Sequence, residues 1–124
     1  MNAVDSSGWL EFFADGPNAS FFAPVIRRPK ELVVPTLSIY EVFKRILQQR
    51  DESQALRAVA AMMQGSVAEL TVSLALDAAR MSAELKLPMA DSVMLATARA
   101  HRATFWTQDA HFEKMEGIRY VRAR

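Results

Sequence analysis

Four carboxylates stand alone in stretches of sequence that are otherwise uncharged and largely apolar. These residues are Asp5, Glu41, Asp91 and Asp109. The stretches around them run over residues 1–10, 32–43, 87–98 and 103–112, with the one histidine counted as neutral. A carboxylate that leaves water must take up a proton, find hydrogen-bond donors or meet a cation. Any fold of this chain therefore has to solve the same problem four times, or once at a shared site.

A shared site would favour a metal ion. If the fold brings the four carboxylates together, their mutual repulsion adds to the cost of burial, and a divalent cation relieves both. Oxygen donors without a soft ligand suit Mg²⁺ or Mn²⁺. Such an ion can activate water and stabilise the charge that builds on a phosphodiester during displacement. The pattern therefore favours a hydrolytic metal site.

The composition is that of a globular domain. Of the 124 residues, 51% are apolar and 23% are charged, and the net charge is only +1. No strong overall field attracts nucleic acid, so such contacts would depend on local basic patches. The absence of cysteine excludes disulfides, thiolate metal sites and cysteine nucleophiles. No uncharged apolar run approaches the about 18 residues that span a bilayer, so we expect no membrane association and a cytoplasmic location.

Short β-type runs alternate with longer helical stretches, which predicts an α/β domain with a mainly parallel sheet. The predicted strands cover residues 2–4, 32–34, 67–72, 104–107 and 118–121. Helical stretches include residues 9–13, 21–26, 36–47, 74–85 and 91–100, with another that ends near Met63. No repeat, linker or low-complexity segment interrupts this alternation, and we expect one domain over residues 1–124.

The predicted elements place the acids at one edge of the sheet. Asp5 directly follows the first strand, and Asp109 lies two residues beyond the fourth. In open α/β sheets, ligands bind beyond the carboxyl ends of the strands. Glu41 lies early in the helix that follows the second strand, and Asp91 lies in the first turn of its helix. We expect Asp5, Asp91 and Asp109 to hold the metal and Glu41 to complete the site.

Each acid also has a structural interpretation that needs no metal. Asp5 and Asp91 could be helix N-caps, Asp109 could shape an Asx-turn, and Glu41 could pair with a distant arginine. One site explains all four positions, whereas the structural interpretation needs a separate reason for each. Glu69 is also isolated in its run, although strand alternation would let it face solvent.

Four segments resemble the PIN-domain ribonucleases. These segments are Val4-Asp5-Ser6-Ser7, Glu41 in a helix after a strand, Ala90-Asp91-Ser92, and Thr107-Gln108-Asp109-Ala110-His111-Phe112. Within that family the chain looks most like the VapC-type toxins of toxin–antitoxin pairs. The resemblance implies a three-layer α/β/α sandwich with a five-stranded parallel sheet. It also implies Mg²⁺- or Mn²⁺-dependent endonucleolytic cleavage of RNA, homodimerisation, and inhibition by an antitoxin protein.

The resemblance assigns roles to particular residues. The four carboxylates become the catalytic, metal-binding acids, and Ser6 and Thr107 become supporting hydroxyls. One departure is Arg102, at a helix end where the family often has glycine, so this turn could differ locally. His111 could contact RNA or a carboxylate, or serve only as a hydrogen-bonded structural residue.

Two other functions remain open at this point. A receiver-type signalling domain also binds Mg²⁺ at strand ends, but it expects adjacent acids after the first strand, and Asp5 is followed by Ser6. A catalytically inactive module that only docks an antitoxin is the second alternative. The four glycines are too scattered for a phosphate-binding loop, which argues against a dinucleotide-binding module. Metal-dependent RNA cleavage would separate the nuclease from both alternatives.

Overall fold

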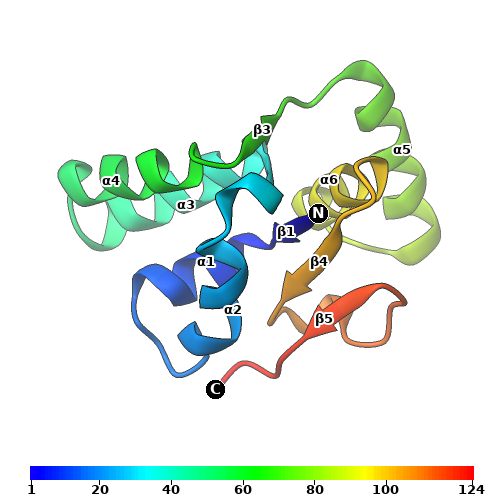
Figure 1. Cartoon of the computed structure of the whole chain (residues 1–124). Coiled ribbons are helices and arrows are strands. Elements are labelled where there is room, and N and C mark those ends of the chain that lie inside the picture. The colour runs from blue at the N-terminus through cyan, green and yellow to red at the C-terminus, as the bar shows by residue number, and fades with distance from the viewer.

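Five short strands alternate with helices in a computed structural model that describes residues 1–124 (Figure 1). The strands are β1 (Asn2–Val4), β2 (Val33–Pro35), β3 (Ser66–Ala68), β4 (Thr104–Thr107) and β5 (Ile118–Tyr120). The helices are α1 (Ser6–Phe13), α2 (Ala19–Ile26), α3 (Thr36–Gln49), α4 (Glu52–Met62), α5 (Val72–Leu85) and α6 (Met89–Ala100). Two 3₁₀ turns, η1 (Pro29–Glu31) and η2 (Ala110–Phe112), complete the elements.

All strand pairings are parallel, as the alternation of strands and helices predicts. One ladder has the order β1-β4-β5, and a second pairs β2 with β3. A single parallel bridge between Asn2 and Leu32 joins the two ladders. The strands therefore lie in the order β3-β2-β1-β4-β5, and the predicted α/β fold with a mainly parallel sheet is confirmed.

Alternating side chains of the strands feed two separate cores. Val4 of β1 packs in a buried cluster with residues of α1, α2, α3, α4 and β2. Its neighbour Ala3 packs in a second buried cluster with residues of α6, β4 and η2. Because successive strand residues point to opposite faces of a sheet, the two clusters lie on its two sides. The result is a three-layer arrangement with β1 at its centre (Figure 1).

The predicted strand over residues 67–72 was wrong in its second half. Strand β3 ends at Ala68, and the hydroxyl of Thr71 accepts the backbone N–H of Leu74 at 3.2 Å, so α5 begins at Val72. Leu70 and Val72 are 48% and 79% exposed. In the sequence these apolar side chains resembled those of a buried strand, but in the structure they lie at the surface.

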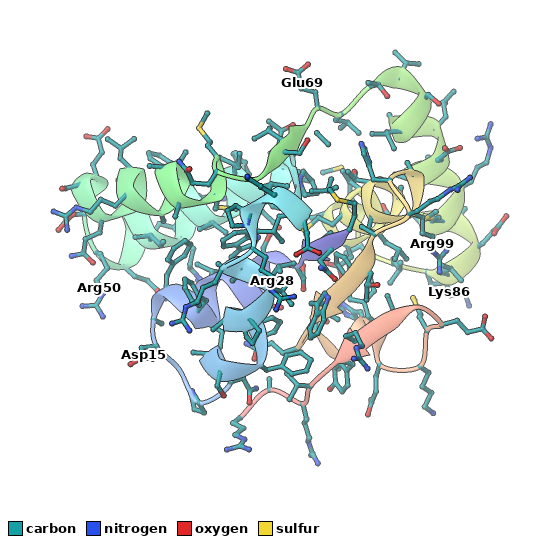
Figure 2. All side chains as sticks on the ribbon, viewed as in Figure 1. Asp15, Arg28, Arg50, Glu69, Lys86 and Arg99 are labelled. Carbon is teal, nitrogen blue, oxygen red and sulfur yellow. The ribbon has the colours of Figure 1, made fainter.

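Other local predictions can be compared with the structure in the same way. Glu69 is exposed and points away from the domain, as expected (Figure 2). Helix α6 begins two residues before Asp91, which lies in its first turn. Arg102 has a φ of 53°, so the turn after α6 keeps the left-handed geometry that glycine would favour. No helix is both long and apolar enough to cross a membrane.

Gly8 allows α1 to pack closely on its neighbours. A Cβ atom at this position would lie 2.6 Å from a ring carbon of Phe22 and 2.7 Å from a methyl carbon of Val4. Phe22 and Val4 are themselves 0% and 1% exposed, so they have little room to move. The glycine therefore sets how closely α1, which follows Asp5, approaches the sheet.

We predict that Gly8→Ala destabilises the domain. Alanine in an exposed helix stabilises by about 1 kcal/mol relative to glycine, so a helix without tertiary constraint would gain stability. The overpacking described above should reverse that sign and cost about 1–3 kcal/mol. Urea denaturation followed by circular dichroism measures the change in the free energy of unfolding. An increase in stability would contradict the close packing of α1.

Candidate active site and metal centre

The parallel pairing of β1 with β4 brings Asp5 and Asp109 to the same edge of the sheet. Val4 is in register with Trp106, and the backbone N–H of Asp5 donates to the Trp106 carbonyl at 2.9 Å. Asp109 follows two residues after β4 ends. Both side chains therefore start from the carboxyl ends of adjacent strands, where α/β sheets bind their ligands.

The hydroxyl of Thr107 connects these two acids. Thr107 is 0% exposed, and its Oγ1 donates to Oδ2 of Asp5 at 2.8 Å while it accepts the backbone N–H of Asp109 at 2.9 Å. The hydroxyl of Ser7 donates to the same Oδ2 at 2.8 Å. No donor reaches Oδ1 of Asp5. One carboxylate oxygen is therefore fixed by the protein, and the other is free for a ligand.

Two helices supply the other acids. Glu41 lies on α3, which starts directly after β2, and its Oε1 accepts a hydrogen bond from the hydroxyl of Ser6 at 2.8 Å. Ser6 Oγ also lies 3.4 Å from the sulfur of Met94. Asp91 lies in the first turn of α6 and is 9% exposed. The predicted supporting hydroxyls thus contact different acids, Ser6 on Glu41 and Thr107 on Asp5.

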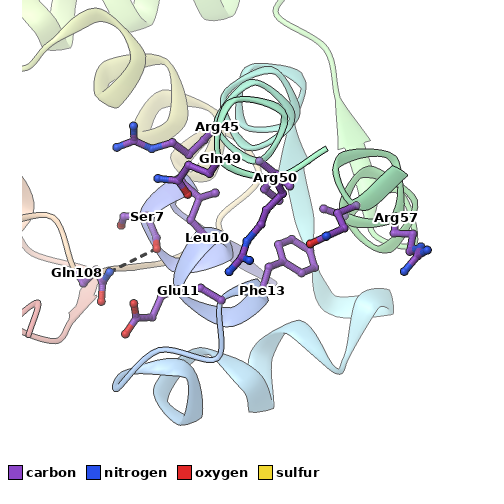
Figure 3. Close-up of a pocket in the computed structure, with 13 residues that line it drawn as sticks. Ser7, Leu10, Glu11, Phe13, Arg45, Gln49, Arg50, Arg57 and Gln108 are labelled. Atoms are coloured by element: carbon purple, nitrogen blue, oxygen red, sulfur yellow. Dashed lines mark hydrogen bonds between the residues drawn. The ribbon is translucent and has the colours of Figure 1, made fainter. Parts of the chain in front are cut away.

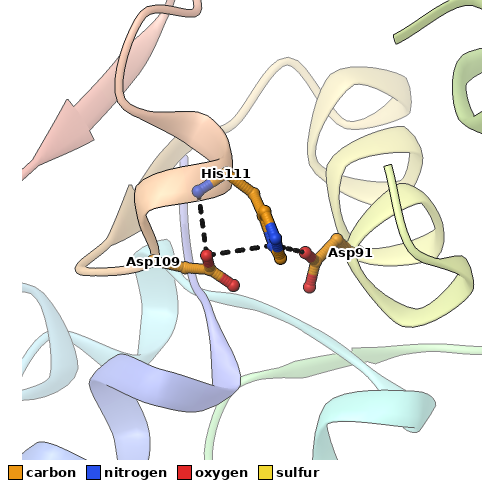
Figure 4. Close-up of side chains that lie close together, drawn as sticks. All are labelled: Asp91, Asp109 and His111. Atoms are coloured by element: carbon orange, nitrogen blue, oxygen red, sulfur yellow. Dashed lines mark hydrogen bonds and ion pairs between the residues drawn. The ribbon is translucent and has the colours of Figure 1, made fainter. Parts of the chain in front are cut away.

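His111 lies between two of the acids (Figure 4). Its Nδ1 is 2.8 Å from Oδ2 of Asp91 and 3.1 Å from Oδ1 of Asp109. Its backbone N–H also donates to Oδ1 of Asp109 at 2.9 Å. Potential ligand atoms of Asp91, Asp109 and His111 all lie within 4.8 Å of one another. Of the uses of His111 left open by the sequence, contact with carboxylates is the one observed.

All four acids line one cleft of about 390 Å³. Its wall also includes Tyr40, Lys44 and Arg45 of α3. The acids are not equivalent within it, because Asp5 and Glu41 lie outside the tight set that Asp91 and Asp109 form with the histidine. The convergence on which the sequence interpretation depended is present in the structure.

The alternative explanations for the acids hold only in part. Asp5 is at the N-cap position of α1, but its side chain caps no backbone N–H, and Pro88 rather than Asp91 precedes α6. Glu41 forms no ion pair, because the ion pairs of the chain join Asp77 to Arg80 and His111 to its two acids. Asp109 does shape the turn into η2. Asp5, Glu41 and Asp91 therefore do not have the capping or arginine-pairing roles that would explain them without a metal.

Burial and mutual repulsion shift the protonation of the cluster. Burial, together with the smaller effect of the charges of Asp91 and Asp109, raises the pKa of Asp5 to about 6, despite the hydrogen bonds from Ser7 and Thr107. Burial also raises the pKa of Asp91, as do the charges of Asp109 and Glu41, while His111 lowers it. The pKa of His111 is raised in turn, chiefly by its hydrogen bond to Asp91. These directions are those expected for carboxylates that are partly buried close to one another.

The donor set fits a divalent metal. Four carboxylates in one cleft, one of them with an oxygen that no protein donor reaches, provide the oxygen ligands that Mg²⁺ and Mn²⁺ prefer. The raised pKa of Asp5 and Asp91 shows that their charged forms are unfavourable without a counter-charge. A cation bound among Asp5, Asp91 and Asp109 would remove that penalty.

The sequence interpretation missed the role of Ser7. Its hydroxyl donates to Asp5 at 2.8 Å, the same distance as that of Thr107. The run of two serines after Asp5 was a usable signal, because both lie in the first turn of a helix that starts at the sheet edge. Lys44 and Arg45, one of the local basic patches that the sequence offers for contact with nucleic acid, flank the cleft.

Comparisons with known proteins agree with this architecture. A family model described as the PIN domain matches residues 3–118. A toxin–antitoxin complex from Klebsiella pneumoniae superposes with a TM-score of 0.80 at 20% identity and covers 98% of this chain and 96% of that one. VapC20 of Mycobacterium tuberculosis, a sarcin–ricin-loop-cleaving toxin, superposes at 0.79 with 15% identity, covering 100% and 99%.

A third solved structure is the DNA-bound VapBC complex of Salmonella typhimurium, with a TM-score of 0.71, 15% identity and 98% of each chain covered. No curated protein matches the sequence. At these identities the solved structures establish a shared fold over the whole chain. The family model covers nearly all of the sequence, and this chain therefore belongs to the PIN-domain family.

Proposed function

We propose that the protein is a metal-dependent endoribonuclease and the toxin of a toxin–antitoxin pair. PIN domains are nucleases, which supports hydrolysis of a phosphodiester. The observation that carries the proposal is the convergence of four isolated carboxylates in one cleft. The three solved structures named above are toxins or toxin–antitoxin complexes, and this supports an antitoxin protein as the partner.

In this proposal Asp5, Asp91 and Asp109 would hold Mg²⁺ or Mn²⁺, which would supply activation of water and stabilisation of the charge that develops on the phosphate. Ser7 and Thr107 fix Oδ2 of Asp5 and so direct its free Oδ1 into the site. Ser6 fixes Oε1 of Glu41, and this leaves Oε2 free to orient a water molecule by accepting a hydrogen bond from it.

His111 acts on the same site as a positioning residue. Its imidazole contacts both Asp91 and Asp109, which come from different elements, and its own side chain is 56% exposed. These contacts hold the carboxylates of α6 and of the turn after β4 close to each other.

An exposed apolar segment supports the expected homodimer. Val67, Leu70, Val72 and Leu76 are each more than a third exposed and lie close together in sequence, from β3 into the first turns of α5. Strand β3 is also at an edge of the sheet. Burial of this segment against a second copy would remove apolar surface from water.

We predict that Asp5→Asn abolishes RNA cleavage while the domain remains folded. The substitution removes the charge that faces the metal, and metal assistance contributes several kcal/mol to such reactions, so turnover should fall by about a hundredfold or more. Cleavage of a structured RNA is followed with and without Mn²⁺, and EDTA should stop the wild type. Asp15→Asn, the same substitution at an exposed position in the turn after α1, serves as the control.

Undiminished cleavage by Asp5→Asn would remove Asp5 from the mechanism, and cleavage in EDTA would require chemistry without a metal. A folded wild-type protein that binds an antitoxin but cleaves no RNA with Mn²⁺ would favour the docking module instead. Receiver-type chemistry would show as phosphorylation of a carboxylate by a small phosphodonor, which we do not expect from a PIN domain.

We predict that metal-free stability falls as pH rises, because of Asp5. The pKa of this carboxyl is about 6 in the folded state against 3.8 for the ordinary group, so the folded state binds the proton more tightly. Stability from this source is complete below pH 4 and is lost as pH rises to about 6, with a size of about 3 kcal/mol. Asp5→Asn should therefore be more stable than the wild type at pH 7.5 in EDTA.

Thermal melts between pH 4 and pH 8 check this expectation. The advantage of the variant should disappear at low pH, and added Mn²⁺ should stabilise the wild type alone. Asp91 and His111 also have a raised pKa and change stability in the same direction, so the informative quantity is the difference between the two proteins. Parallel pH profiles for both proteins would contradict the strained burial of Asp5.

We predict that Leu76→Lys yields a monomer. Leu76 is 53% exposed, so a lysine there costs the isolated fold little, whereas it would place a charge in the proposed interface. Light scattering after size exclusion measures the mass. Leu56→Lys on α4, at the same exposure of 53%, is the matched control and should leave the mass unchanged. A dimeric Leu76→Lys would place the interface elsewhere.

A further inference from the structure

A second and larger cleft adjoins the acidic one. It has a volume of about 650 Å³ and lies between α1, the C-terminal end of α3, and α4 (Figure 3). Ser7, Leu10 and Arg45 line both clefts, so they form a common wall. A chain-like molecule in the acidic cleft can therefore continue into the larger cleft without leaving the surface.

Three arginines give the larger cleft a positive character. Arg45, Arg50 and Arg57 line it, and none of them forms an ion pair. Its one acid, Glu11, is already engaged, because it accepts the backbone N–H of Asn18 at 2.6 Å. We call this surface the arginine cleft. Its guanidinium groups retain most of their capacity to bind an anion, and their geometry suits phosphate.

RNA bound at the acidic cleft would require a positively charged surface nearby. Four carboxylates repel the phosphates of an RNA strand, and the net charge of the chain is only +1, so no general field compensates for the repulsion. A bound metal neutralises part of the acid charge but reaches only the phosphates next to it. Phosphates further along the strand need cations of their own, and Arg45 stands at the boundary between the two clefts.

Resting on the function proposed above, we propose that the arginine cleft binds the phosphate backbone of single-stranded RNA on one side of the cleaved bond. Arg45 contacts the phosphates closest to the metal, and Arg50 and Arg57 contact those further away. The amides of Gln49, Gln54 and Gln108 add hydrogen-bond donors for the backbone, and the apolar wall at Leu10, Phe13 and Ile46 receives sugar and base faces. An acidic peptide is the competing occupant, and the test separates the two.

The salt dependence of RNA binding tests this proposal directly. For single strands, the logarithm of the binding constant falls with the logarithm of salt concentration with a slope of about 0.7 per neutralised phosphate. We expect the combined variant Arg45→Gln, Arg50→Gln, Arg57→Gln to reduce the magnitude of the slope by about 2. Fluorescence anisotropy with a labelled single-stranded RNA, in EDTA to prevent cleavage, provides the binding constants.

Two controls separate a specific effect from charge loss or unfolding. Arg99→Gln removes one positive charge at an exposed position on α6, on the opposite side of the molecule from Arg50, and should leave the slope unchanged (Figure 2). Its matched partner, Arg50→Gln alone, should reduce the magnitude of the slope by about 0.7. The triple lysine variant at positions 45, 50 and 57 keeps the charge and should restore most of the slope. An unchanged slope in the glutamine variant overturns the proposal.

A parallel titration with a labelled oligoglutamate peptide addresses the competing occupant. If the glutamine variant loses only peptide binding and keeps the RNA slope, the cleft belongs to a protein partner and the proposal fails. Cleavage by the wild type with Mn²⁺ is scored separately. Its absence refutes the nuclease function, whereas an active enzyme with an unchanged slope refutes the arginine cleft alone.

Discussion

The hydrogen bond from the Thr107 hydroxyl to Asp5 is the interaction on which the rest of the candidate site depends. It joins the end of β4 to the end of β1, and the same hydroxyl accepts the backbone N–H of Asp109. Because Thr107 is fully buried, its single proton has no solvent partner to choose instead. One side chain thus links the orientation of Asp5, to which Ser7 also donates, with the path of the chain toward Asp109. The other acids arrive on helices that the sheet positions.

Charges of opposite sign are concentrated in separate regions of the surface, although the net charge is small. A net charge of +1 conceals an acidic cleft and an adjoining cleft lined by Arg45, Arg50 and Arg57. The two share a wall, so opposite potentials meet within a short distance along the surface. A negatively charged polymer could bind through its backbone in the arginine cleft, while the acidic cleft would need a metal ion to accept the neighbouring phosphate. The nuclease proposal requires both kinds of surface.

Much of the site could be predicted from the sequence because charge in an apolar stretch is a strong signal. Asp5 and Asp109 were placed correctly by their position after strands, and the parallel fold followed from the alternation of elements. The predicted end of the third strand at Val72 was wrong, because β3 ends at Ala68 and apolar residues on an exposed surface have the same pattern as those of a buried strand. The cap formed by Thr71 decided that boundary.

Other features depended on side-chain reach, which spacing does not determine. The contact of His111 with both Asp91 and Asp109 requires the η2 turn to carry its ring back over the site. The arginine cleft combines residues from three helices, α1, α3 and α4, whose relative placement depends on packing. In the sequence, Arg50 and Arg57 resemble the solvated charges of any surface helix.

The single bridge between Asn2 and Leu32 has a consequence for the geometry of the acids. Asp5 and Asp109 belong to the ladder of β1, β4 and β5, whereas Glu41 follows β2 in the other ladder. The backbone seam between the two halves of the sheet therefore passes through the candidate site. Side-chain packing and the Ser6–Glu41 hydrogen bond hold Glu41 against its counterparts. A small shear along this seam would move Glu41 relative to Asp5 and Asp109.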